Sequence, residues 1–240
     1  EILSSIESQG KLDEALAQSI ANAATLAEAE DLYRPFKPKR RTRASIAREK
    51  GLEPLAQSIF TQEKDTLSPS ELAKPFVDPE KGVNTVDDAL QGAADIIAET
   101  VADSATLRKT LRNFLLMHGI LKTESKPGAD PVYEMYAAYS EPVAKIAPHR
   151  VLAIDRGERE GALKVSLEAD LERCRKTIVR DFVKENTPCA DFVRNAAFDG
   201  FSRLIFPSLE REVRSALTEK AAEQAIRVFG VNLQQLLMQP

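Results

Sequence analysis

The sequence predicts a mainly α-helical fold with one small β-hairpin. Ala, Leu, Glu and Arg recur at helical spacing along most of the 240 residues, whereas Trp is absent and Gly and Pro are sparse. Hydrophobic residues make up 43% of the chain and charged residues 29%, which is the composition of a chain that buries a core. We therefore expect a multi-helix module in which strands are few.

Short helices are predicted for the first 60 residues, which we expect to form one part, with residues 61–240 as a second, central part. Thr25 and Glu28 form a capping box at the start of the third helix. Helices this short are marginal alone, so they must pack against one another.

A stiff connector follows the third helix. Pro35 ends that helix, and Pro38 keeps the preceding residue out of helical geometry. A new short helix is expected to begin near Thr42, because Thr is a preferred helix N-cap. A free helix N-terminus would favour phosphate.

Two longer helices are predicted in the middle of the chain. Thr85 caps the first, and Ser104 opens the second, which Gly119 ends. The polar stretch from Lys122 to Pro131 is expected to be a loop, and a further helix is expected over 132–139.

Strands are expected in one place only. Apolar residues alternate around a polar turn with two glycines, which predicts a β-hairpin over 150–167. Helices close the chain, the last of them over 208–229, before Gly230. Its apolar stripe is expected to pack within the chain, because exposed large side chains forfeit burial free energy; the stripe consists of Leu209, Val213, Leu217, Ala221 and Val228.

Basic residues concentrate around the connector. The segment from Arg34 to Lys50 carries a local charge of +7, so the remainder of this chain of net charge −4 carries −11. Such segregation in an acidic protein is typical of a surface that binds a polyanion. The predicted nucleic-acid-binding residues are Lys37, Lys39, Arg40, Arg41, Arg43 and Arg48.

Three interpretations of these cations stay open. They contact nucleic-acid phosphates without reading sequence, they pair with carboxylates of this chain or of another domain, or they form a solvated face. Tyr33 and Phe36 flank the cations and either stack on bases or anchor the connector by packing.

Three long motifs in series resemble the Tex family of bacterial transcription accessory proteins, which includes YhgF-like members. They are EDLYRPFKPKRRTRASIAREKGLEPLA, YSEPVAKIAPHRVLAIDRGEREGALKV and DGFSRLIFPSLEREVRSALTEKAAEQAIRVFGVNLQQLLMQP. The resemblance implies the family's N-terminal helical region, with a helix-turn-helix-like portion. The family's RNase H-like (YqgF-type) domain, helix-hairpin-helix motifs and OB-fold lie beyond the matching region.

The resemblance also implies that the protein binds RNA in transcription. Nucleic acid is therefore the expected partner, with RNA favoured over DNA. The alternative is a protein-interaction scaffold that contacts no nucleic acid. Its partner would be RNA polymerase or the remaining domains of a longer protein. Position 1 is Glu rather than Met, so we expect a piece of a longer protein.

Other classes of function have little support. No apolar run reaches the roughly 20 residues of a membrane span, so a cytoplasmic protein without a membrane partner is expected. Cys174 and Cys189 have no metal-knuckle spacing, and His118 and His149 are the only histidines. We therefore expect no cofactor, no metal and no catalytic activity.

Overall fold

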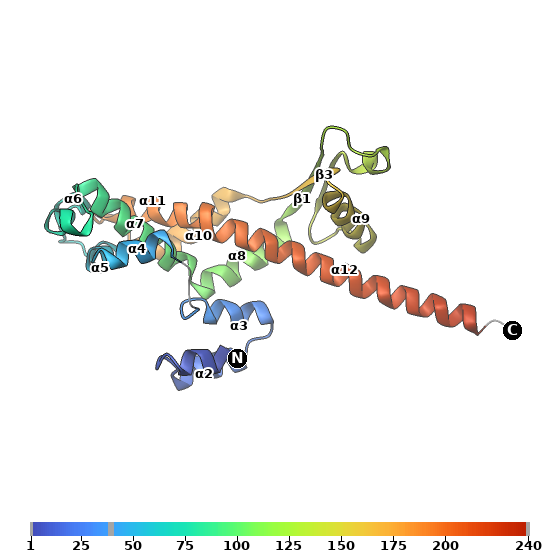
Figure 1. The fold of residues 1–240 in the computed structure, drawn as a ribbon, viewed down its shortest axis with the longest axis horizontal. Helices are drawn as coiled ribbons and strands as arrows, with labels where there is room; N and C mark the ends of the chain where they lie inside the picture. Colours follow the sequence, from blue (N-terminus) through green and yellow to red (C-terminus); the bar gives the residue numbers. More distant parts are fainter. Residues whose placement is uncertain (1, 38–40, 239–240) are drawn as a thin grey trace. The chain divides into compact units, whose positions relative to one another are not determined.

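The computed structural model describes residues 2–37 and 41–238, and it confirms the mainly helical prediction (Figure 1). The chain forms two compact units, one of residues 1–110 with 172–207 and the other of residues 111–171 with 208–240. α8 (Ala105–His118) and α12 (Phe206–Leu237) each have residues in both, and the first residue of α10, Leu171, belongs to the second unit. The predicted division near residue 60 stays a prediction.

Unit 1 is helical in its described residues. Its α-helices are α1 (Ile2–Glu7), α2 (Glu14–Ala21), α3 (Leu26–Tyr33), α4 (Arg43–Glu49), α5 (Glu53–Thr61), α6 (Pro69–Ala73), α7 (Val86–Ala102), α10 (Leu171–Phe182) and α11 (Ala190–Gly200). Short turns η1 (Lys74–Phe76) and η2 (Pro79–Lys81) and the π-helical η4 (Phe201–Ile205) complete it.

The helix α7 is the centre of unit 1. Its residues Ile96, Ile97 and Val101 are buried, and α4, α5, α6 and α11 pack around it. A Cβ built on Gly92 would lie 2.3 Å from Leu52 Cδ1, so the missing side chain lets the segment between α4 and α5 approach α7. Thr85 caps α7 as the sequence predicts.

Unit 2 contains a three-stranded antiparallel sheet of order β2-β1-β3. Its elements are β1 (Ile120–Ser125), η3 (Pro131–Tyr136), β2 (Ala138–Pro142), α9 (Pro148–Arg159) and β3 (Leu163–Glu168). α9 packs on the sheet, where Ile154 and Leu163 are fully buried (Figure 1). Gly157 makes this close packing possible, because a Cβ there would lie 2.7 Å from Leu163 Cδ1.

The hairpin predicted over 150–167 is wrong. Pro148–Arg159 is the helix α9, and its buried Val151, Ile154 and Gly157 recur every three residues, which is a helix face. Pro148 occupies the first turn, where a proline is favoured. Only Leu163–Glu168 is a strand, and its partner β1 lies about 40 residues earlier in the sequence.

The predicted loop over 122–131 and helix over 132–139 are also partly wrong. Lys122–Ser125 belong to β1, the turn follows at Gly128, where φ is +77°, and 131–136 form the 3-10 helix η3 before β2. The polar composition concealed β1, because the strand is buried on one face only: Leu121 and Thr123 are buried, whereas Lys122 and Glu124 face out.

The last helix, α12, is longer than predicted and continues through Gly230 to Leu237. Its first half packs within unit 2, where Leu209, Val213 and Ala221 are buried and Leu217 contacts the core, as the sequence predicts. Val228 departs from that prediction, since half of it is exposed. Figure 1 shows the second half of α12 leading away from the sheet and α9 of this unit.

No helix in residues 2–37 or 41–238 has both the length and the apolar character needed to cross a bilayer.

Candidate nucleic-acid interface

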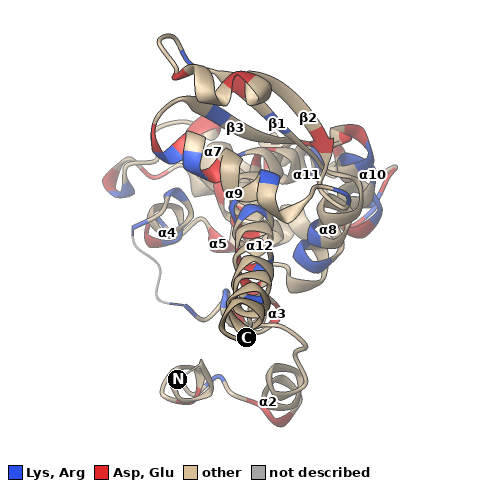
Figure 2. Ribbon diagram, turned by 90° about the vertical axis from the view of Figure 1, so that its right-hand side faces the viewer, with Lys and Arg blue, Asp and Glu red and all other residues tan. Residues whose placement is uncertain are grey.

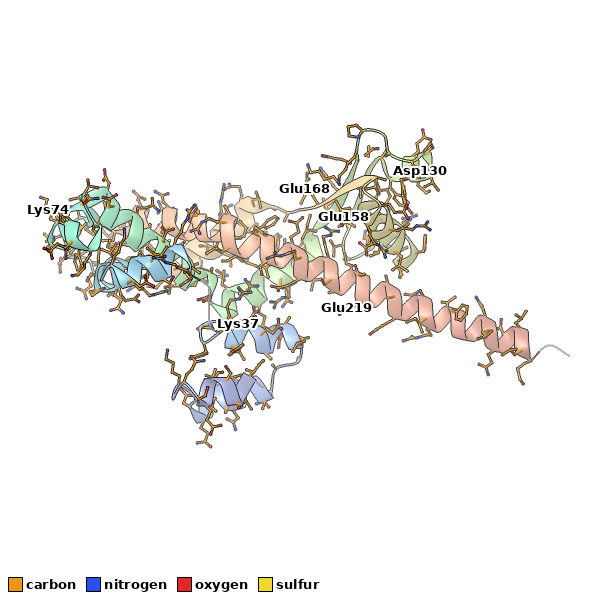
Figure 3. The ribbon with its side chains drawn as sticks, viewed as in Figure 1. Lys37, Lys74, Asp130, Glu158, Glu168 and Glu219 are labelled. Atoms are coloured by element: carbon orange, nitrogen blue, oxygen red, sulfur yellow. The ribbon has the colours of Figure 1, made fainter. Side chains whose placement is uncertain are left out.

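The predicted cations differ in their surroundings. Lys37, Arg41 and Arg43 are exposed, and Figure 2 shows Lys and Arg just before α4 begins. Lys37, labelled in Figure 3, and Arg43 form no side-chain hydrogen bond or ion pair within the described part of the chain. Arg41 lies 3.9 Å from Glu49, and both side chains are largely exposed. Lys39 and Arg40 lie outside the described residues.

Arg48 has a different environment, because two carboxylates of unit 1 bind its guanidinium. Its Nη1 donates to Glu99 Oε2 at 2.5 Å, and its Nε donates to Glu53 Oε2 at 2.6 Å. Partial burial alone would lower the pKa of Arg48, but the hydrogen bonds to Glu99 and Glu53 outweigh this effect and raise the pKa. Arg48 therefore fastens α4 to α7 and α5.

The N-terminus of α4 is closed by the chain itself. Thr42 Oγ1 accepts from the backbone N–H of Ser45, and Ser45 Oγ accepts from the N–H of Thr42. Thr42 Oγ1 also donates to Glu99 Oε1 at 3.1 Å. With only seven residues and an internal cap, α4 does not present the free N-terminus that the sequence suggested.

The two flanking aromatic residues anchor the connector. Tyr33 Oη lies 2.8 Å from Ser5 Oγ in hydrogen-bond contact, and Gln9 Nε2 donates to the carbonyl oxygen of Phe36. Both rings are partly buried. Lys50 Nζ donates to the carbonyl oxygen of Gly82. The Lys50 contact holds the end of α4, whereas the contacts of Tyr33 and Phe36 and the Thr42–Glu99 hydrogen bond hold the two ends of the connector and leave its described cations to solvent.

Glu99 is the residue that sequence reasoning missed. It is buried on α7, 7% exposed, and binds both Thr42 and Arg48 from more than 50 residues away in the sequence. Nothing in its local pattern distinguishes it from an ordinary helix-surface glutamate, because the contacts arise only when α4 packs on α7.

Metal binding and reactive thiols have little support in the described residues. Among the residues that the structure describes, no group of three or more His, Cys, Asp and Glu side chains could hold a metal ion. Cys174 and Cys189 are both buried and form no disulfide, and burial raises the pKa of the Cys189 thiol.

The fold and the exposed cations define a mainly helical module with a positively charged connector. The family model described as Tex central region-like matches residues 64–229, about two thirds of the chain. The chain therefore belongs to the Tex central region-like family, as the sequence resemblance predicts.

Three relatives match almost the whole chain. It is 42% identical over 245 residues to the Bacillus subtilis (strain 168) protein YdcI, covering 100% of this chain and 34% of the relative. It is 33% identical over 246 residues to the "Transcriptional accessory protein Tex" of Neisseria gonorrhoeae (99% and 32%). It is 30% identical over 250 residues to the human "S1 RNA-binding domain-containing protein 1" (97% and 25%). The chain thus spans about a third or less of these relatives' lengths.

Proposed function

We propose that this chain is the helical scaffold of a Tex-like RNA-binding transcription accessory protein, and that its connector is an auxiliary, sequence-independent nucleic-acid-binding surface. The observation that carries the proposal is the exposure of Lys37 and Arg41 on a connector whose ends are held, and of Arg43 at the start of α4 beside it. The names of the Neisseria and human relatives, one transcriptional and one RNA-binding, support the same function.

The contacts would be to phosphates. Guanidinium and ammonium groups bind phosphate oxygens regardless of the base attached. Base stacking is not part of the proposal, since the Tyr33 hydroxyl is in hydrogen-bond contact with Ser5 and the rings of Tyr33 and Phe36 are both partly buried. In this proposal Lys39 and Arg40 add to the same cationic surface, whereas Arg48 supports it by fixing α4.

The second candidate is a protein-interaction scaffold that docks on RNA polymerase or on other domains of a longer chain. The exposed apolar side chains on the second half of α12, such as Ile226 and Phe229, favour it. It predicts little affinity for nucleic acid at any salt concentration.

A titration with labelled single-stranded RNA and duplex DNA at several salt concentrations tests the proposal. The variant Arg41→Ala/Arg43→Ala should weaken binding about equally for all sequences. The slope of log K against log salt should fall by roughly 0.7 to 0.9 for each phosphate that the variant no longer neutralises.

The matched control is Arg159→Ala/Arg227→Ala, which removes two exposed arginines of unit 2 and the same net charge. This control variant should bind RNA and DNA as tightly as the unchanged chain does. Equal weakening in both double variants would mean that only net charge matters, and absent binding at low salt would favour the docking scaffold.

A further inference from the structure

A single buried carboxylate, that of Glu99, holds both ends of α4. Glu99 lies on α7, and its side chain is 9% exposed. Its Oε1 accepts from Thr42 Oγ1 at 3.1 Å, and its Oε2 accepts from Arg48 Nη1 at 2.5 Å. Thr42 is the N-cap of α4 and Arg48 lies in its last turn, so the carboxylate ties the whole helix to α7.

A carboxylate is a costly side chain at this position. An ionised group that leaves water loses its hydration, and a well-packed apolar side chain of similar size often stabilises the fold equally well or better. The neighbouring Ile96, Ile97 and Ala102 of α7 are apolar and buried. Stability alone therefore does not explain a carboxylate here, whereas its two hydrogen bonds specify one arrangement of α4.

That arrangement fixes the backbone that carries two exposed arginines. Thr42 stands between Arg41 and Arg43 in the sequence, and both arginines are exposed. The Thr42 hydroxyl has one proton, which it donates to Glu99, and it accepts from the backbone N–H of Ser45. The chain between the two arginines is therefore held to α7.

The other end of the connector is held as well. Tyr33 Oη is in hydrogen-bond contact with Ser5 Oγ, and Gln9 Nε2 donates to the carbonyl oxygen of Phe36. A cationic segment that is held at both ends has less conformational freedom to lose when it binds a polyanion. Without the contact to Glu99, binding would have to order the second end of the connector.

We propose that Glu99 is a positioning residue of the connector, which contacts no phosphate itself but raises nucleic-acid affinity by holding Arg41 and Arg43 in place before binding. This inference rests on the proposed nucleic-acid-binding function of the connector. A carboxylate beside such a surface repels a polyanion, so removal of its charge should strengthen binding if electrostatics alone mattered. Positioning predicts the opposite sign.

The test compares Glu99→Gln with Glu49→Gln in the full chain, with a labelled oligouridine of about 20 nucleotides as the probe. Each replacement removes one negative charge near the connector, and Glu49 is the matched control because it is exposed and lies 3.9 Å from Arg41. Thr42 and Arg48 donate to different oxygens of Glu99, and an amide keeps only one of them, so one hydrogen bond is lost.

Glu99→Gln should bind the oligouridine about three- to tenfold more weakly than the unchanged chain, because binding must then order the connector. The slope of log K against log salt should stay the same, since no phosphate contact is lost. Glu49→Gln should bind as tightly as the unchanged chain or more tightly.

Variants of Thr42 test the same contact from its other side. Thr42→Ala removes the hydroxyl and should weaken binding to a similar extent as Glu99→Gln. Thr42→Ser keeps a hydroxyl and should recover most of the affinity that Thr42→Ala loses. Circular dichroism checks that each variant folds.

Limited trypsin digestion reports on the connector without any nucleic acid. Trypsin cleaves after Lys and Arg, and its rate at a held segment follows the fraction of time for which that segment is open. Cleavage after Arg41 and Arg43, identified by fragment mass, should be several-fold faster in Glu99→Gln than in Glu49→Gln.

The inference is overturned if Glu99→Gln binds the oligouridine as tightly as Glu49→Gln does, whatever the rates of cleavage. It is also overturned if the weaker binding comes with a lower salt slope, because a lost phosphate contact would then explain it. Failure of the proposed function itself would look different, since Arg41→Ala/Arg43→Ala would leave the affinity unchanged and the two glutamate variants would differ only in cleavage by trypsin.

Discussion

Arg41 and Arg48 belong to one basic segment but have different partners. Arg41 has a 74% exposed side chain and lies 3.9 Å from an exposed carboxylate. Arg48 has a 38% exposed side chain and donates to Glu99, which is almost fully buried. An exposed pair contributes little to stability, whereas removing a charge that donates to a buried carboxylate deprives that carboxylate of a charged hydrogen bond where water cannot replace it.

Replacement of these two arginines should therefore separate binding from stability. Arg48→Ala is expected to lower the free energy of unfolding by about 1–3 kcal/mol, because Glu99 loses a charged hydrogen bond. Arg41→Ala should change it by less than about 0.5 kcal/mol. Urea unfolding followed by circular dichroism measures both, and equal effects of the two replacements would contradict the assignment.

At the scale of elements, α7 and α11 pack so closely that a glycine is required between them. A Cβ on Gly200 would lie 2.6 Å from the carbonyl oxygen of Ala98 and 3.1 Å from its Cα. Backbone atoms cannot rotate aside as a side chain can. Gly230 in α12 has the opposite surroundings, with no atom within 4 Å of a built Cβ.

Alanine at these two glycines should act in opposite directions. Gly200→Ala is expected to destabilise unit 1 by about 1–3 kcal/mol, because it overpacks the helix pair. Gly230→Ala should stabilise its helix by up to about 1 kcal/mol, because Ala is the better helix former. Denaturant unfolding and the helical circular dichroism signal report the two effects. A stable Gly200→Ala variant would show that α7 and α11 can separate without cost.

At the scale of the whole molecule, the second half of α12 exposes a run of large apolar side chains. They recur at three- and four-residue steps, as in a helix that packs on another; the stripe consists of Ile226 (72% exposed), Phe229 (67%), Leu233 (42%) and Leu236 (66%). Contiguous exposed apolar surface of this kind promotes association.

We therefore expect the chain to self-associate as its concentration rises. Size-exclusion chromatography with light scattering should show a mass above 26.5 kDa at about 100 µM. Ile226→Ser/Phe229→Ser should restore the monomer, while Val132→Ser/Met135→Ser, which changes two equally exposed residues of η3, should not. A chain that stays monomeric at that concentration would contradict the expectation.

The sequence by itself determined the features that depend on local chemistry. Thr42 and Thr85 cap their helices, since a cap needs only a side-chain oxygen and the following N–H groups. Helical spacing in α7 and in the first half of α12 predicted their buried faces. The three long motifs identified the family. The segregation of charge predicted the exposed cations of the connector.

Only the tertiary structure decided the features that depend on distant partners. The sequence of β1 is typical of a polar loop, and only the pairing of β2 and β3 with its two edges makes it a strand. The sequence of α9 was interpreted as a strand, because its apolar residues are too few to distinguish a spacing of two residues from one of three or four. Arg48 reads as one more surface cation until Glu99 is brought to it by the packing of α4 on α7. For β1 and Arg48 the physical reason is the same, because hydrogen bonds and ion pairs between residues far apart in the sequence leave no periodic signal in it. For α9 the helical period is present, and its packing on the sheet shows which period holds.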